Sequence, residues 1–178
     1  MYIKPVVATM ALAAMLIATA CSGGNEQKSP NPSAAEKIAS EGRAAGPMAD
    51  GAFKATITTA GPPAKMKPGQ KTTLTVKVKN IGNAAWPAHG RSGDGYFQVN
   101  LGDNWFDAKN KRIEKHPYVR SGLPKDLQPG EEADVQLVIT APNVPGDYSL
   151  QIDLVQEMVA WFSEKGSTAP KFKVTVGG

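Results

Sequence analysis

The chain has 178 residues, enough for one ordinary domain with additional segments, and its composition is that of a globular protein. Its formal net charge of +4 is spread without runs of like charge, which argues against a dedicated nucleic-acid-binding protein. The 18 glycines and 14 prolines indicate many turns and few long helices.

Residues 1–20 have the pattern of a signal peptide that is removed from the mature protein. Lys4 supplies a positive charge, residues 6–17 form an apolar stretch, and small residues stand just before Cys21. The apolar stretch is too short for a comfortable membrane span, which takes ~20 residues. No other segment of the sequence is long and apolar enough to cross a bilayer.

Cys21 is the single cysteine of the chain, so it has no disulfide partner within it. The preceding residues, Ala18, Thr19 and Ala20, resemble the lipobox of bacterial lipoproteins, although Ala18 stands where leucine is commonest. This resemblance implies that the Cys21 thiol receives a diacylglycerol, that the chain is cleaved before it and that the new amine is acylated. Several acyl chains anchor a protein durably, whereas one chain binds a bilayer only marginally. No other cofactor is expected.

The residues after Cys21 predict a location and a tether. In lipoproteins of Gram-negative cells, aspartate after the cysteine favours the inner membrane, so Ser22 implies the periplasmic face of the outer membrane. Residues 21–51 are rich in Ser, Gly, Ala, Pro and Glu, and cannot bury enough apolar surface to offset their ordering entropy. We therefore expect a disordered, lipidated tether with a reach of ~30 Å.

From residue 52 to residue 178 the sequence changes to short segments in which apolar and polar residues alternate. This period of two is typical of half-buried strands, and Gly- and Pro-rich turns separate the segments. The expected strands cover residues 53–59, 72–80, 96–102, 133–140, 147–155 and 171–176, with a seventh between Trp105 and Val119. The pattern predicts an all-β fold, a seven-stranded antiparallel β-sandwich.

The stretch "PGDYSLQID" resembles the tyrosine corner of immunoglobulin-like folds, with Tyr148 two residues before Leu150. Residues 70–176 more broadly resemble bacterial Ig-like modules, through "VKNIGNAAWP" and "APNVPGDY". Such modules include the cell-adhesion-related kind, modules appended to envelope glycosyltransferases and the central Ig-like domain of some autophagy receptors. The resemblance implies that Tyr148 hydrogen-bonds backwards and that Leu150 packs on the opposite sheet. It specifies the fold well and the function poorly.

The aromatic residues are the candidate ligand-binding residues. Trp105 and Phe106 stand among polar and cationic residues, so we expect them to be an exposed pair able to stack on a sugar ring. Trp161 and Phe162 are further candidates, although Trp86 and Trp161 are better interpreted as caps on the two ends of the core.

Metal and calcium sites are not expected. His89 and His116 are far apart in sequence and lack a second ligand at metal spacing. Asp94 and Asp103 lie in "SGDG" and "LGDN", which are better interpreted as turns than as calcium loops, because an EF-hand needs more carboxylates at fixed spacing.

Catalysis is not expected either. Glu131 and Glu132 are adjacent, so on a strand they would face opposite sides and could not flank one glycosidic bond. We expect them to form the turn and start of a strand. The sequence therefore favours a non-catalytic, lipid-anchored envelope protein that binds an unknown protein or glycan. The alternative is a carbohydrate-binding module for peptidoglycan or exported polysaccharide that uses Trp105 and Phe106.

Overall fold

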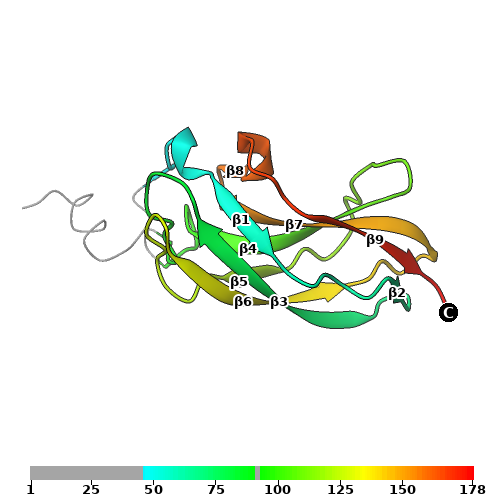
Figure 1. Ribbon diagram of the computed structural model, residues 1–178. Helices are drawn as coiled ribbons and strands as arrows, with labels where there is room; N and C mark the ends of the chain where they lie inside the picture. Colours follow the sequence, from blue (N-terminus) through cyan, green and yellow to red (C-terminus); the bar gives the residue numbers. More distant parts are fainter. Residues whose placement is uncertain (1–45, 91–92) are drawn as a thin grey trace, which may run out of the picture. The chain divides into compact units, whose positions relative to one another are not determined.

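The computed structural model describes residues 46–90 and 93–178 (Figure 1). The expected signal peptide, Cys21 and most of the expected tether lie outside these residues. The described part contains two short 3-10 helices, η1 (Asp50–Ala52) and η2 (Ser163–Lys165). Its strands are β1 (Ala55–Thr58), β2 (Lys65–Met66), β3 (Lys71–Asn80), β4 (Val99–Phe106), β5 (Arg120–Gly122), β6 (Glu132–Thr140), β7 (Gly146–Gln156), β8 (Ala160–Trp161) and β9 (Lys171–Val176).

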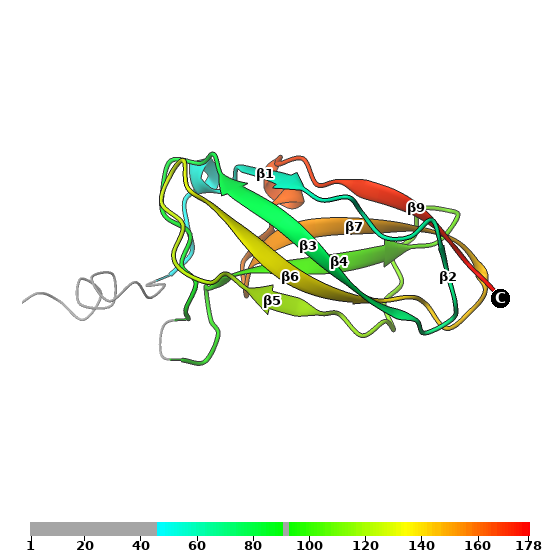
Figure 2. The same ribbon diagram turned by 60° about the horizontal axis from the view of Figure 1, so that its bottom comes forward.

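The strands form two sheets packed as a sandwich (Figures 1 and 2). One sheet has the order β1-β3-β6, and the other has the order β2-β9-β7-β4-β5 with β8 paired to β7. This confirms the all-β, immunoglobulin-like sandwich. Seven of the described strands have three or more residues, whereas β2 and β8 have two each and are too short for a periodic pattern. The parallel pairing of β2 with β9 departs from the purely antiparallel arrangement that we expected.

The core lies between the two sheets. Along β3 and β6, apolar residues that face this core alternate with mostly polar residues that face solvent. Leu74, Val76 and Val78 of β3 are buried while the residues between them are exposed, and β6 repeats the pattern. Strands β4 and β7 behave differently, because β4 is buried on both faces over nearly its whole length and β7 is buried on both faces from Leu150 to Gln156. The expected seventh strand is β5, which begins at Arg120, just after the expected range.

The predicted tyrosine corner is present. The Tyr148 hydroxyl donates to the Val144 carbonyl oxygen at 2.8 Å, four residues back in the chain. Leu150, two residues further on, is fully buried in the core. The corner thus fixes the path of the chain into β7, and Leu150 packs without a disulfide.

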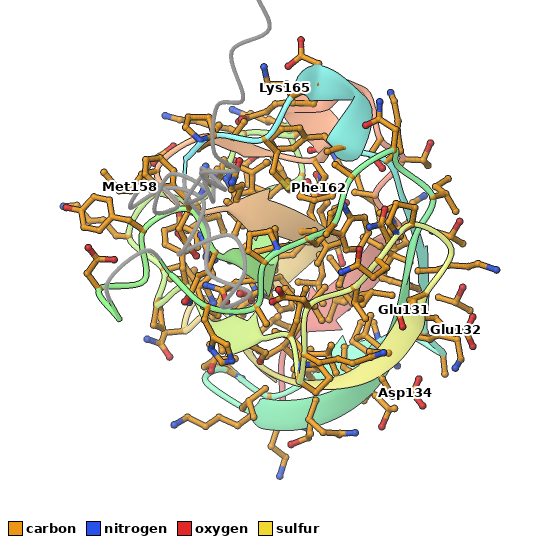
Figure 3. The ribbon with its side chains drawn as sticks, turned by 90° about the vertical axis from the view of Figure 1, so that its left-hand side faces the viewer. Glu131, Glu132, Asp134, Met158, Phe162 and Lys165 are labelled. Carbon is orange, nitrogen blue, oxygen red and sulfur yellow. The ribbon has the colours of Figure 1, made fainter. Side chains whose placement is uncertain are left out.

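Asn80 holds the loop that leads to Trp86. Its side-chain amide donates to the Ala84 carbonyl at 2.9 Å and to the Leu127 carbonyl at 2.8 Å, while its oxygen accepts from Gly82 N–H at 2.9 Å. Trp86 then enters the core, where its ring packs edge-on against Phe162, as expected for a core cap. Figure 3 shows Phe162 pointing inward at this end of the sandwich.

The last residues of the expected tether contact the domain. Gln156 of β7 accepts from Met48 N–H at 2.9 Å, and its amide donates to the carbonyls of Gly46 at 3.1 Å and Phe97 at 2.9 Å. Residues 46–51 are therefore hydrogen-bonded to the sandwich that we expected to begin at residue 52. Over the residues that the structure describes, no helix is long and apolar enough to cross a membrane.

Candidate binding face of the six-stranded sheet

The outer face of the six-stranded sheet, defined here as the side turned away from the core, carries polar and cationic side chains in register. Ser149 of β7 lies between Phe106 of β4 and Lys173 of β9, and Gln151 lies in the next row beside Lys171. Strand alternation places these side chains on the side opposite the core residues of the same strands. This face is the candidate functional site.

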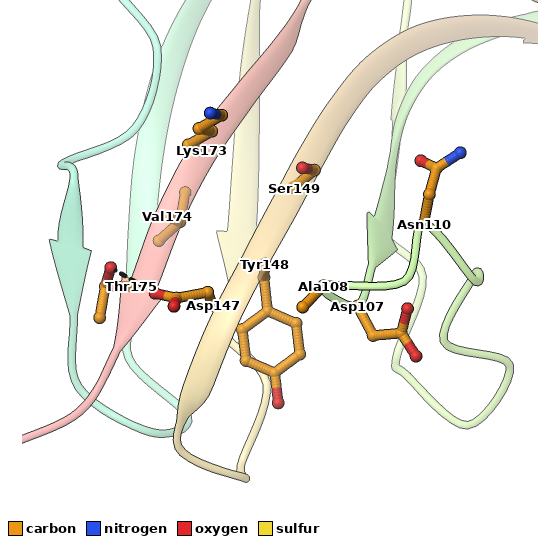
Figure 4. Close-up of a pocket in the computed structure, with 9 residues that line it drawn as sticks. All are labelled: Asp107, Ala108, Asn110, Asp147, Tyr148, Ser149, Lys173, Val174 and Thr175. Atoms are coloured by element: carbon orange, nitrogen blue, oxygen red, sulfur yellow. Dashed lines mark hydrogen bonds between the residues drawn. The ribbon is translucent and has the colours of Figure 1, made fainter.

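A groove of about 370 Å³ opens on this face (Figure 4). Residues of β7, of β9 and of the turn after β4 line it: Asp107, Ala108, Asn110, Asp147, Tyr148, Ser149, Lys173, Val174 and Thr175. Asp147 accepts from the Thr175 hydroxyl at 2.8 Å, and Asp107 accepts from the N–H groups of Lys109 and Lys111 at 2.9 and 2.8 Å. Both carboxylates are thus held by local hydrogen bonds, which gives the groove fixed polar walls.

Lysines border the groove. The Lys171 ammonium lies 4.2 Å from the centre of the Phe106 ring and donates to the Asn110 side-chain oxygen at 3.5 Å. Lys173 is exposed and forms no ion pair with another described residue. Its ammonium group is therefore available to a ligand.

Two arginines stack on Trp161 on the same face. The guanidinium carbon of Arg120 lies 4.4 Å from the Trp161 ring centre, and that of Arg112 lies 5.7 Å from it. Gly102 makes room for the stack, because a Cβ atom there would lie 2.6 Å from Arg120 Nη1 and 3.2 Å from Trp161 Cη2. Trp161 thereby covers β4, which explains why this strand is buried on both faces.

The charges of the two arginines are satisfied differently. Arg120 forms an ion pair with Glu157 at 3.1 Å, with both side chains partly exposed. Arg112 lies 4.8 Å from the Tyr118 ring centre, and its buried Nε has no hydrogen-bond partner in the part of the chain that the structure describes. Its guanidinium also has no carboxylate partner there. Two aromatic rings hold Arg112 in place, so its charge is oriented but not neutralised.

The two carboxyl groups with raised pKa values are fully buried. Burial raises the pKa of Asp153 to about 6, although the Ser163 hydroxyl and the N–H groups of Ser163 and Leu154 oppose the shift. Burial likewise raises the pKa of Asp103, which accepts from Trp105 Nε1 at 3.0 Å and from Val119 N–H at 3.2 Å. Neither carboxyl group reaches the surface, so both act within the fold.

Asp153 should make stability depend on pH. Because its pKa is raised by folding from 3.8 to about 6, the folded state favours the protonated form, and that stability is lost as pH rises through 6. We expect the free energy of unfolding of the wild type, relative to Asp153→Asn, to fall between pH 4 and pH 7 by on the order of 2–3 kcal/mol. Urea denaturation across this range measures it, with Asp147→Asn on the same strand as the exposed control. A flat difference would contradict the assignment.

The structure separates the four aromatic candidates. Trp105 has 0% exposure and lies in the core, so its expected exposure is wrong. Phe162 is also in the core, whereas Phe106 and Trp161 lie on the outer face, where Lys171 and Arg120 cover their rings. Trp161 has 9% exposure and is therefore largely buried, but it lies over Gly102 on the outer face and not at an end of the core, where we expected it as a cap.

Other sequence-based candidates have structural positions as well. Asp94 accepts from Tyr96 N–H at 2.9 Å in a turn, as expected, but Asp103 is a buried strand residue and the turn expected there is wrong. Glu131 accepts from Gln128 N–H at 2.9 Å and Glu132 begins β6, which confirms the expected turn and strand start. Among the described residues, no three His, Cys, Asp or Glu side chains are grouped so that they could hold a metal ion.

Sequence reasoning missed the arginines and lysines of the outer face. Lys171 and Lys173 alternate with half-buried Phe172 and buried Val174 in β9, so the period of two already placed them on one face. Arg112 gives no comparable signal, because its position depends on Trp161, which is 49 residues away in the chain and reaches the same surface through β8.

Comparison with solved structures finds weak similarity at low identity. A β-glucosidase from Listeria innocua is 16% identical with a TM-score of 0.42, over 70% of this chain and 16% of that chain. The CARDB domain of PF1109 from Pyrococcus furiosus is 16% identical with a TM-score of 0.41, over 69% of this chain and 94% of that chain. The sporulation control protein Spo0M from Bacillus subtilis is 17% identical with a TM-score of 0.38, over 70% of this chain and 49% of that chain.

No curated protein sequence matches the chain. A family model does match it, over residues 59–165, and is described as the Ig-like domain from next to BRCA1 gene. The match begins just after β1, ends with η2, and includes the Asn80 loop, the tyrosine corner and Trp161. Because it covers more than half of the sequence, the chain belongs to this family of Ig-like domains.

Proposed function

We propose that this chain is a lipid-anchored, non-catalytic Ig-like module of the bacterial envelope. In this proposal the outer face of the six-stranded sheet binds an acidic segment of a protein partner. The observation that carries the proposal is Arg112, a guanidinium that is oriented by Tyr118 and Trp161 and has no carboxylate partner among the described residues. A carboxylate from a partner would supply the missing charge and accept bidentate hydrogen bonds.

Charge complementarity supports an acidic partner. Lys171 lies over Phe106, whose backbone pairs with that of Arg112, and Lys173 lines the groove in Figure 4. Complementary charge raises the rate of association and excludes wrong partners. Carboxylates of a partner segment would thus meet cations from both parts of the face.

The carbohydrate-binding alternative has less support. Stacking a sugar requires an exposed aromatic face, and Trp105 is inside the core while Lys171 lies over the Phe106 ring. A protein partner does not require such a face. We therefore favour the protein and treat a glycan as a contrary outcome of the experiment.

The anchor in this proposal is Cys21, on the strength of the lipobox resemblance and the apolar segment before it. Ser22 after the cysteine supports the periplasmic face of the outer membrane. Metabolic labelling with a fatty acid tests the anchor directly. We expect labelled wild type and unlabelled Cys21→Ala, and label retained by Cys21→Ala would contradict the anchor.

Crosslinking in intact cells followed by quantitative pull-down tests the binding face. We expect Arg112→Gln to recover at least about tenfold less of the partner, because hydrogen bonds to charged groups contribute about 1.5–3 kcal/mol. Lys79→Gln on β3, in the other sheet, is the matched control and should recover the wild-type amount. Equal recovery by both variants, or recovery of a polysaccharide, would contradict the proposed partner.

A further inference from the structure

Strand β6 is the one long edge strand in the part of the sandwich that the structure describes. The three-stranded sheet ends in β1, with four residues, and in β6, with nine. The other sheet ends in β2 and β5, which have two and three residues. Figure 2 shows β6 beside β3, on the side away from β1. A long edge strand presents a row of unpaired backbone groups, which is a template for another strand.

The hydrogen-bond pattern shows which residues point outward. At the two ends of the β3–β6 ladder, Asn80 N–H donates to the Glu131 carbonyl at 2.9 Å, and Ala141 N–H donates to the Gln70 carbonyl at 2.8 Å. Hydrogen-bonded pairs recur at every second position of an antiparallel ladder. The backbone groups of residues 133, 135, 137 and 139 therefore point towards β3.

The intervening residues of β6 direct their N–H and C=O groups away from β3. These residues are Glu132, Asp134, Gln136, Val138 and Thr140. The backbone groups of the first four have no hydrogen-bond partner within residues 46–90 and 93–178. The free edge thus offers regularly spaced donors and acceptors over most of the strand.

Several of the devices that protect an edge strand are missing from β6. The strand contains no proline, glycine or lysine, and its register with β3 runs without a bulge from Glu132 to Thr140. Its two carboxylates are already paired, because the Lys77 ammonium lies 3.2 Å from Glu132 and 3.3 Å from Asp134. Figure 3 shows both carboxylates at the surface. Val138 is exposed at the other end of the strand.

The sequence of this edge is complementary to itself. In an antiparallel pair centred on Gln136, Asp134 of one copy faces Val138 of the other, and Glu132 faces Thr140. No like charges are directly opposite in this register. A register centred on Asp134 would place two Asp134 carboxylates together, and one centred on Val138 would place Asp134 opposite Pro142, which has no N–H.

We propose that two copies of this chain pair through the free edges of β6, antiparallel and centred on Gln136. The pairing is isologous, since the same edge serves both copies, and it joins two three-stranded sheets into one. It uses the sheet opposite the candidate binding face, so it is independent of the proposed acidic partner.

Cysteine crosslinking of the full chain in its native membrane tests the pairing. Directly opposite residues have Cα atoms about 5.5 Å apart, within the range that a disulfide spans. In the proposed register only Gln136 meets its own copy, so mild oxidation of Gln136→Cys should give a covalent dimer. Thr75→Cys, which lies opposite Gln136 on β3, is the matched control. Its two copies would be three strand spacings apart, about 14 Å, and should not crosslink.

A second variant tests the role of the edge hydrogen bonds. Val138→Pro removes an N–H that points away from β3, so the ladder to β3 stays intact and the proline sits where edge strands tolerate it. Added to Gln136→Cys, it should lower the yield of dimer at least tenfold. Every variant retains Cys21, so any crosslink through Cys21 contributes equally to the dimer yield of each variant.

Three results would overturn the pairing. They are absence of dimer from Gln136→Cys, an equal yield from Thr75→Cys, and crosslinking of Gln136→Cys to a different protein. A dominant disulfide at Asp134→Cys would overturn the register. The partner pull-down with Arg112→Gln uses the other sheet, so failure of one proposal does not decide the other.

Discussion

Replacing Trp105 by alanine should remove a large part of the stability of the domain. The ring has no exposure, contacts His116 and Tyr148 with ring centres 5.9 and 6.3 Å away, and its Nε1–H donates to buried Asp103. Deleting a buried tryptophan costs about 3–5 kcal/mol, because it leaves a cavity and here also removes a donor from a buried carboxylate. Urea denaturation followed by circular dichroism measures the loss.

The neighbouring aromatic residue provides the control for that result. Phe106 lies on the opposite face of β4, half-buried beneath Lys171. Phe106→Ala should cost less than half as much as Trp105→Ala, since part of its ring already contacts water. Similar losses for the two variants would mean that the inner and outer faces of β4 are assigned incorrectly.

Asn80→Ala should be destabilising without creating a large cavity. The substitution removes two donors and one acceptor, and leaves Gly82 N–H and the Ala84 carbonyl without their partner. Leaving a buried polar group unsatisfied costs about 1–3 kcal/mol, so we expect a total loss of about 2–4 kcal/mol. The same denaturation experiment measures it.

An exposed asparagine in the same loop separates this effect from a general effect of alanine. Asn83 is exposed and its side chain makes no hydrogen bond to another described residue, so Asn83→Ala should change stability by less than about 0.5 kcal/mol. If Asn80→Ala were equally mild, the loop would not depend on the Asn80 amide, and Trp86 would be held by its packing alone.

The predictable part of the fold is the part with one face in the core and one in water. Strands β3 and β6 have this environment, and their alternation predicted both their position and their buried residues. Strand β4 does not, because Trp161 covers its outer face at Gly102. Its polar residues suggested an exposed segment, yet Asp103 is buried because Trp105 and Val119 supply it with hydrogen bonds.

The candidate site was less predictable than the fold because it depends on contacts between distant segments. Arg112, Tyr118 and Trp161 form one stack, but neither their spacing nor their residue types predict the contact. Local polarity was a poor guide to which aromatic residues face solvent, because Trp105 stands among polar residues in the sequence and is buried in the core. The signal peptide and the lipidation of Cys21 remain predictions from the sequence.

The side chain of Gln156 has a mechanical consequence. It is hydrogen-bonded to Gly46 and Met48 at the start of the described chain, and to Phe97 before β4. A pull on the N-terminal segment is therefore transmitted first to this amide, and through it to β7, a central strand of the six-stranded sheet. Tension along the chain would therefore act on β7, inside the six-stranded sheet, before it could separate an edge strand from that sheet.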